Sequence, residues 1–182
     1  MQETRFPEEE GTTIVVKTRG PATAEMALNL RIPGWAARGV TVALNGAPQQ
    51  VTATPATYVT LKRVWKDGDK IQLRLPMSLH TESIPDDPTL QAVLYGPLVL
   101  AGRLGKQGLT RELTYGPLAP DSAKPIPVPR LTISKGMAAE SVEAVRGEPL
   151  SFRTVGQPNV TRLSPLFQVF DERYTVYWKT AR

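Results

Sequence analysis

The residues of this chain that could do chemistry are mostly carboxylates in adjacent or alternate positions. Three pairs stand out: Asp67 and Asp69, Asp86 and Asp87, and Asp171 and Glu172. Two carboxylates held about 5 to 9 Å apart across a sugar can hydrolyse a glycosidic bond. Neighbouring residues in a turn usually point apart, and each pair has a local explanation: a predicted hairpin, a turn before Pro88 and the start of a strand. The sequence therefore predicts no catalytic residue and no activity for this chain by itself.

The sequence contains few residues that could bind a metal ion or act as a thiol. The chain contains no cysteine and one histidine, His80. Without cysteine there is no thiolate nucleophile, no disulfide and no cysteine-based metal site, and a lone imidazole does not make a multi-histidine centre. His80 follows a predicted strand, so we interpret it as a surface or edge residue. We expect no bound metal and no cofactor.

The aromatic residues are the remaining candidates for binding. Strand alternation places Trp65 and Trp178 on inward faces, which predicts that both are core residues. Trp35 follows Pro33-Gly34 in a bend, where it either projects from a loop tip or is covered against the end of the domain. Tyr177 faces away from Trp178 and is either exposed or packed on a partner. Trp35 and Tyr177 are therefore the candidate carbohydrate-binding or interface residues.

Short strands must position these side chains. In MALNLRI, alternation directs Met26, Leu28, Leu30 and Ile32 inward. Asn45-Gly46 and Asp67-Gly68 each predict a tight hairpin, and Gly96-Pro97 separates two further strands. The ending DERYTVYW predicts one terminal strand with Tyr174, Val176 and Trp178 on a single face. We expect this strand to return to the sandwich formed by the first part of the chain. The predicted class is all-β, an antiparallel β-sandwich or jelly roll.

Composition divides the chain into three segments. Residues 1–102 are predicted to form the main body of the sandwich, residues 103–130 a connection rich in proline and glycine, and residues 131–182 C-terminal strands that complete or extend the sandwich. Proline removes the N–H that a central strand would donate, which favours a surface connection in the middle segment. With 182 residues and 41% apolar content, the chain can bury a substantial core.

Charge and the N-terminus exclude two partner classes. The net charge is +5, but lysine and arginine are scattered, so we expect no nucleic acid partner. The segment MQETRFPEEEGTT has no apolar signal-like region, and no apolar run is long enough to span a bilayer, so we expect no membrane partner. These residues leave the localisation open. Because FPEEEG leads directly into a strand, we expect a fragment of a longer protein.

Five motifs together carry a family resemblance. LRIPGWA, LNG, VWKDGDKIQLRLPM, VLYGPLVLAG and DERYTVYW occur in the order and approximate spacing seen downstream of the catalytic barrel in β-L-arabinofuranosidase-like glycoside hydrolases of family 127. The chain resembles that family from about Phe6 to its end. The resemblance is to the C-terminal β-sandwich region only.

The resemblance implies a parent enzyme with an (α/α)6 catalytic barrel. In this family the nucleophile is a zinc-bound cysteine with further Cys and Glu ligands, and a glutamate is the acid/base; none of these positions has a counterpart here. The chain is thus expected to be a non-catalytic accessory domain that packs against the barrel, on the same or a separate chain. The alternative is an autonomous carbohydrate-binding module, whose partner would be a carbohydrate.

Overall fold

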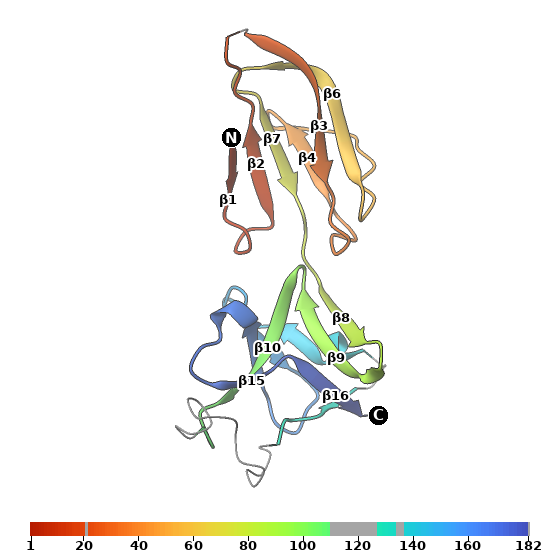
Figure 1. The fold of residues 1–182 in the computed structure, drawn as a ribbon, viewed down its shortest axis with the longest axis vertical. Helices are drawn as coiled ribbons and strands as arrows, with labels where there is room; N and C mark the ends of the chain where they lie inside the picture. The colour runs from red at the N-terminus through yellow and green to blue at the C-terminus, as the bar shows by residue number, and fades with distance from the viewer. Residues whose placement is uncertain (21, 110–126, 134–136, 182) are drawn as a thin grey trace. The chain divides into compact units, whose positions relative to one another are not determined.

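The computed structural model describes residues 1–20, 22–109, 127–133 and 137–181 (Figure 1). Most of these residues form β-strands, and the only helical turns among them are the 3-10 turns η1 (Ala138–Ser141) and η2 (Leu166–Gln168). Every described strand pairing is antiparallel except that of β11 (Leu131–Thr132) with β16 (Tyr177–Ala181). The predicted all-β, antiparallel class is confirmed. Within the described residues, no helix has the length and apolar character needed to cross a membrane.

The chain divides into two units, Met1–Ser78 and Leu79–Arg182. The sequence prediction ended the main body at residue 102, which differs from this division. The reason is strand pairing: the strands between residues 79 and 105 hydrogen-bond to strands of the C-terminal part. Of the predicted connection 103–130, the first three residues belong to a strand and residues 110–126 lie outside the described residues.

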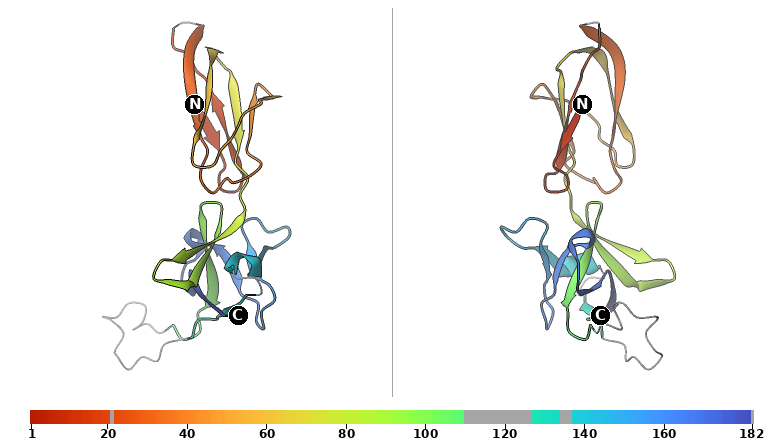
Figure 2. Two further views of the ribbon diagram at one scale, coloured as in Figure 1. Left: turned by 90° about the vertical axis from the view of Figure 1, so that its right-hand side faces the viewer. Right: turned by 60° about the vertical axis from the view of Figure 1, so that its left-hand side comes forward.

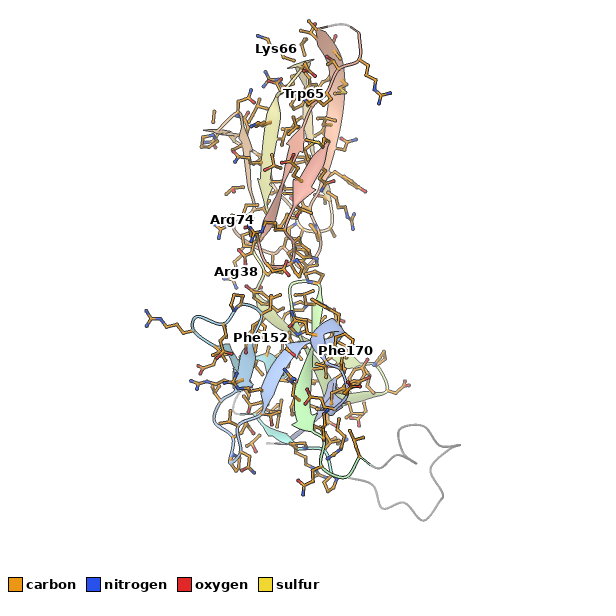
Figure 3. The ribbon with its side chains drawn as sticks, turned by 90° about the vertical axis from the view of Figure 1, so that its left-hand side faces the viewer. Arg38, Trp65, Lys66, Arg74, Phe152 and Phe170 are labelled. Carbon is orange, nitrogen blue, oxygen red and sulfur yellow. The ribbon has the colours of Figure 1, made fainter. Side chains whose placement is uncertain are left out.

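The first unit consists of two sheets that enclose one core. Its strands are β1 (Gln2–Thr4), β2 (Gly11–Val15), β3 (Thr23–Arg31), β4 (Thr41–Leu44), β5 (Ala47–Pro48), β6 (Tyr58–Lys66) and β7 (Lys70–Arg74). One sheet has the order β1-β2-β7-β4-β5 and the other pairs β3 with β6, two layers that can be followed in Figure 2. Trp65 from the small sheet and Ile71 from the large one are fully buried in the same cluster, with Trp65 labelled in Figure 3. The inward alternation predicted for Leu30 and Ile32 is confirmed, whereas Met26 is exposed.

The Asn45-Gly46 hairpin is confirmed. Both residues have positive φ, 51° and 83°, as a type I′ turn requires, and glycine adopts this conformation without steric cost. The flanking strands β4 and β5 pair antiparallel across the turn, with Leu44 opposite Ala47.

The hairpin predicted at Asp67-Gly68 is wrong. β6 pairs with β3 alone among the described pairings, while β7 pairs with β2 and β4, so the turn carries the chain from one sheet to the other. The carboxylate of Asp69 holds this corner: it accepts the backbone N–H of Lys66 at 2.9 Å and the side-chain amide of Asn45 at 2.8 Å. The turn residues predicted the reversal correctly but not the partner strand.

The second unit is one larger sheet system with attached short strands. Its further strands are β8 (Leu79–Ile84), β9 (Asp87–Tyr95), β10 (Leu98–Gly105), β12 (Val142–Ala144), β13 (Phe152–Thr154), β14 (Arg162–Pro165) and β15 (Arg173–Thr175). The order is β11-β16-β9-β10-β14-β13-β12, with β8 paired to β9 and β15 to β10. Figure 1 shows β8, β9 and β10 close together in this unit. Gly96-Pro97 joins β9 to β10 as a tight hairpin, with Leu98 opposite Tyr95.

The terminal segment forms two strands rather than one. β15 pairs with β10, the chain bends at Val176, and β16 pairs with β9. The bend resets the alternation, so Tyr174 is 51% exposed although Trp178 is fully buried. The Thr175 hydroxyl donates to the Tyr177 carbonyl at 2.7 Å across the bend. β16 does return to β9, a strand of the predicted main body, but both belong to the second unit.

Trp178 packs against the backbone of β10 at Gly102. A Cβ at position 102 would lie 2.5 Å from Trp178 Cη2 and still closer to Cζ2, far inside van der Waals contact. Glycine therefore makes room for the indole ring in the core of this unit, which it shares with Val93 and Leu100.

Candidate functional site

The first carboxylate pair stabilises the corner between the sheets. Asp67 accepts the backbone N–H of Thr18 at 2.9 Å. The hydrogen bonds from Lys66 N–H and from the Asn45 amide lower the pKa of Asp69 below its usual value. A general acid needs a raised pKa, so the shift at Asp69 is opposite to the one that acid catalysis requires.

The second and third pairs also make structural contacts. Asp87 accepts Lys179 Nζ at 2.7 Å and the backbone N–H of Thr89 at 3.0 Å, and these contacts, that of Lys179 first, lower its pKa to about 2. Glu172 forms an ion pair with Arg103, whose Nε donates at 2.7 Å. These contacts join β16 to β9 and the start of β15 to β10.

His80 lies in β8, which pairs only with β9 among the described strands, so its predicted edge position is confirmed. The side chain is half-buried. Over the parts of the chain that the structure describes, no three His, Cys, Asp or Glu side chains are grouped so that they could hold a metal ion.

Trp35 is half-buried at a turn between β3 and β4. The Ala36 N–H donates to the Pro33 carbonyl at 3.2 Å, and the indole packs against the core cluster of the first unit. Its ring also stacks on Phe6, with centroids 6.3 Å apart and planes inclined by 28°. Of the two alternatives that the sequence left open, the structure favours the covered position. Phe6, which sequence reasoning missed, is 37% exposed beside it.

Tyr177 is 50% exposed and lines a hollow of about 240 Å³ in the second unit. The hollow lies over β8, β9, the second residue of β10 and the first residue of β16. Its lining includes Glu82, Ser83, Ala92, Leu94, Val176 and Tyr177. Tyr177 belongs to the second unit and Trp35 to the first.

Sequence reasoning missed an exposed apolar segment. In the stretch SPLFQVF, β14 ends at Pro165 and η2 follows. Leu166, Phe167 and Phe170 are 37, 53 and 73% exposed, while Val169 between them is buried. Figure 3 labels Phe170. We call Leu166, Phe167 and Phe170 the η2 patch. The only signal in the sequence was the concentration of large apolar residues after Pro165.

The first unit also has a shallow, polar hollow of about 730 Å³ over the outer face of its larger sheet. Two ion pairs lie there: Arg74 is 3.3 Å from Glu10, and Arg5 is 3.3 Å from Glu9. No aromatic side chain lies among its lining residues. This surface therefore offers solvated ion pairs rather than a shaped site.

Sequence models of two families match the chain end to end. Residues 1–77 match the middle domain of GH127 β-L-arabinofuranosidases, and residues 80–180 match DUF4986, a domain of unknown function. These boundaries coincide with the two structural units. The DUF4986 match covers more than half of the chain, so the chain belongs to that family, and its first unit resembles the middle domain of GH127 β-L-arabinofuranosidases. No curated protein sequence matches the chain.

Solved structures of glycoside hydrolases, two of which are named as GH127 enzymes, share this fold. A glycoside hydrolase is similar over 100% of the chain at 19% identity, with a TM-score of 0.63. A GH127 β-L-arabinofuranosidase from Geobacillus stearothermophilus T6 matches 100% of the chain at 21% identity, with a TM-score of 0.61. A third, a GH127 β-arabinofuranosidase, matches 99% at 15% identity and a TM-score of 0.59. The chain spans 32, 30 and 31% of these three proteins, respectively.

Proposed function

We propose that this chain is a non-catalytic accessory region of a GH127 glycoside hydrolase and packs against a catalytic (α/α)6 barrel. The observation that carries the proposal is coverage: 99 to 100% of the chain matches about a third of each of the three glycoside hydrolase structures. About two thirds of those proteins therefore have no counterpart here. The catalytic function belongs to that remainder.

The residues of the chain support a non-catalytic role. The resemblance implies a cysteine nucleophile and cysteine zinc ligands, and this sequence contains no cysteine. Asp69 and Asp87, two of the paired carboxylates, have lowered pKa values and hold strands and turns together. We therefore expect the purified chain not to hydrolyse aryl β-L-arabinofuranosides.

The η2 patch is the surface that we propose for contact with the barrel. It places two phenylalanines more than half exposed within four residues. Exposed apolar groups gathered in this way mark interaction surfaces, and buried aromatics often dominate binding energies. Trp35 with Phe6 is a second, smaller contact that we propose in the first unit.

The test begins with the gene. We expect a GH127 catalytic barrel to be encoded in the same reading frame or in an adjacent gene. When this chain and that barrel are expressed as separate polypeptides, they should associate. Phe167→Ala with Phe170→Ala should weaken the association by about tenfold or more.

Tyr58→Ala is the matched control, because Tyr58 is an aromatic residue of the first unit that is 58% exposed. It should leave the affinity unchanged. The absence of an encoded barrel, or hydrolysis by this chain alone, would contradict the proposed function. Equal affinities for the double variant and the control would contradict the assigned surface.

An autonomous carbohydrate-binding module remains the second candidate function. One observation favours it: the hollow beside Tyr177, with an apolar floor and polar groups at its rim. This hollow lies outside the η2 patch, so sugar binding and barrel packing are compatible.

A further inference from the structure

The hollow beside Tyr177 has the layout of a binding site for one sugar ring. It lies on the face of β9 opposite to Val93, which is fully buried in the core. Ala92 and Leu94, on the outer face, are nevertheless only 6 and 8% exposed. Neighbouring side chains thus surround Ala92 and Leu94, which form the small apolar base of the hollow.

The strand register sets the width of this hollow. Ala92 of β9 is opposite Tyr177 of β16 on one side and opposite Glu82 of β8 on the other. Paired residues of adjacent strands project from the same face, so these three side chains form one row across the sheet. With strands about 4.8 Å apart, the two outer residues start roughly 10 Å from each other, with only a methyl group between them. That gap accommodates a single ring.

The two sides of the gap provide complementary chemistry. The half-exposed Tyr177 ring offers an apolar face and a phenol hydroxyl. The exposed Glu82 carboxylate makes no hydrogen bond or ion pair with any described residue. A sugar ring has this dual character, with C–H groups that stack on an aromatic face and hydroxyl groups that donate to a carboxylate.

Tyr177 is also held in place before any ligand arrives. The Thr175 hydroxyl donates to the Tyr177 carbonyl at 2.7 Å, and Lys179 pairs with Asp87 on β9. The Thr180 hydroxyl donates to the Thr89 carbonyl at 3.0 Å. These contacts fix the backbone of β16 on β9, so the place of Tyr177 in the row is set before binding.

A quaternary ammonium ligand fits less well. Such cations are recognised in cages of several aromatic rings. Here one ring stands over an aliphatic floor of Ala92 and Leu94. We propose that this groove, between Tyr177 and Glu82 over Ala92, binds a neutral glycosyl unit of a saccharide chain, independently of the packing function proposed above.

The test is calorimetric and NMR titration of the full chain with arabino-, xylo- and gluco-oligosaccharides. At least one of the three should bind saturably. Tyr177→Ala should weaken that binding by about tenfold, because the stacking surface is lost, whereas Tyr177→Phe should retain most of it. Glu82→Gln should weaken binding by a smaller factor, because a charge-assisted hydrogen bond becomes a neutral one.

Tyr174→Ala is the matched control, since Tyr174 is equally exposed at 51% but does not line the hollow. It should bind like the unsubstituted chain, and all variants should keep its melting temperature. No saturable binding by any of the three sugars, or equal binding by Tyr177→Ala, would overturn the proposal; so would tetramethylammonium binding more tightly than the sugars. Phe167→Ala with Phe170→Ala should leave sugar binding intact, which separates this proposal from barrel packing.

Discussion

The indole of Trp178 can lie against β10 only because residue 102 has no Cβ. The Trp178 ring is completely buried. A Cβ at position 102 would also lie 3.3 Å from Thr175 Cγ2, so the indole and the Thr175 side chain leave no room for it. Cores at native packing density tolerate added volume poorly. The fit between one glycine and one tryptophan therefore determines how the terminal strand packs in the second unit.

Gly102→Ala should lower the free energy of unfolding of the second unit by about 1 to 3 kcal/mol, the usual range for overpacking. Urea denaturation followed by tryptophan fluorescence measures it. Gly34→Ala is the control, because a Cβ there meets no atom within 4 Å, and it should change stability by less than about 0.5 kcal/mol. Equal midpoints for the two variants would contradict the packing argument.

At the scale of elements, β16 is fastened to β9 by side chains as well as by the sheet. The Lys179–Asp87 ion pair spans the two strands at 2.7 Å. Because the folded-state pKa of Asp87 is lowered to about 2, the carboxylate stabilises the fold while it is ionised. That contribution is complete above the unfolded pKa, 3.8, and is lost as the pH falls through about 2.

Asp87→Asn should therefore lower the urea midpoint of the second unit at pH 5. Near pH 2 the variant and the unsubstituted chain should converge, because the native carboxylate becomes protonated there. Asp86→Asn is the control, since Asp86 is exposed and its side chain makes no hydrogen bond or ion pair with a described residue. A difference between Asp87→Asn and the unsubstituted chain that stays constant from pH 5 to pH 2 would contradict the linkage.

Element pairing also explains which features could be predicted from the sequence. Alternation correctly placed Trp65 and Trp178 in cores, and the Asn45-Gly46 pair correctly predicted a hairpin, where both residues have positive φ. The turn at Asp67-Gly68 was recognised, but local residues do not specify which strand pairs with which. Tyr177 followed from its alternation with Trp178. The position of Glu82 could not be predicted from the sequence, because only the strand register across β9 brings it into one row with Ala92 and Tyr177.

At the scale of the whole molecule, the chain contains two cores with no residue in common. One consists of side chains between Ile14 and Leu75, and the other of side chains between Leu79 and Trp178. Hydrophobic burial is the main stabilising contribution to a domain, so each unit is stabilised by its own hydrophobic core. Loss of one core should therefore leave the other folded.

Deletion of residues 171–182 tests this independence. It removes β15, β16 and the buried Trp178, whose loss alone costs about 3 to 5 kcal/mol, a large share of a domain's stability. The second unit should unfold and the truncated chain should aggregate through its exposed strands. The indole N–H of Trp65, which donates to the Met26 carbonyl at 3.0 Å, should keep its native NMR position in whatever remains soluble. A truncated chain that stays monomeric and melts like the full chain would show that the terminal strands are dispensable, and loss of the native Trp65 signal would show that the two units fold as one.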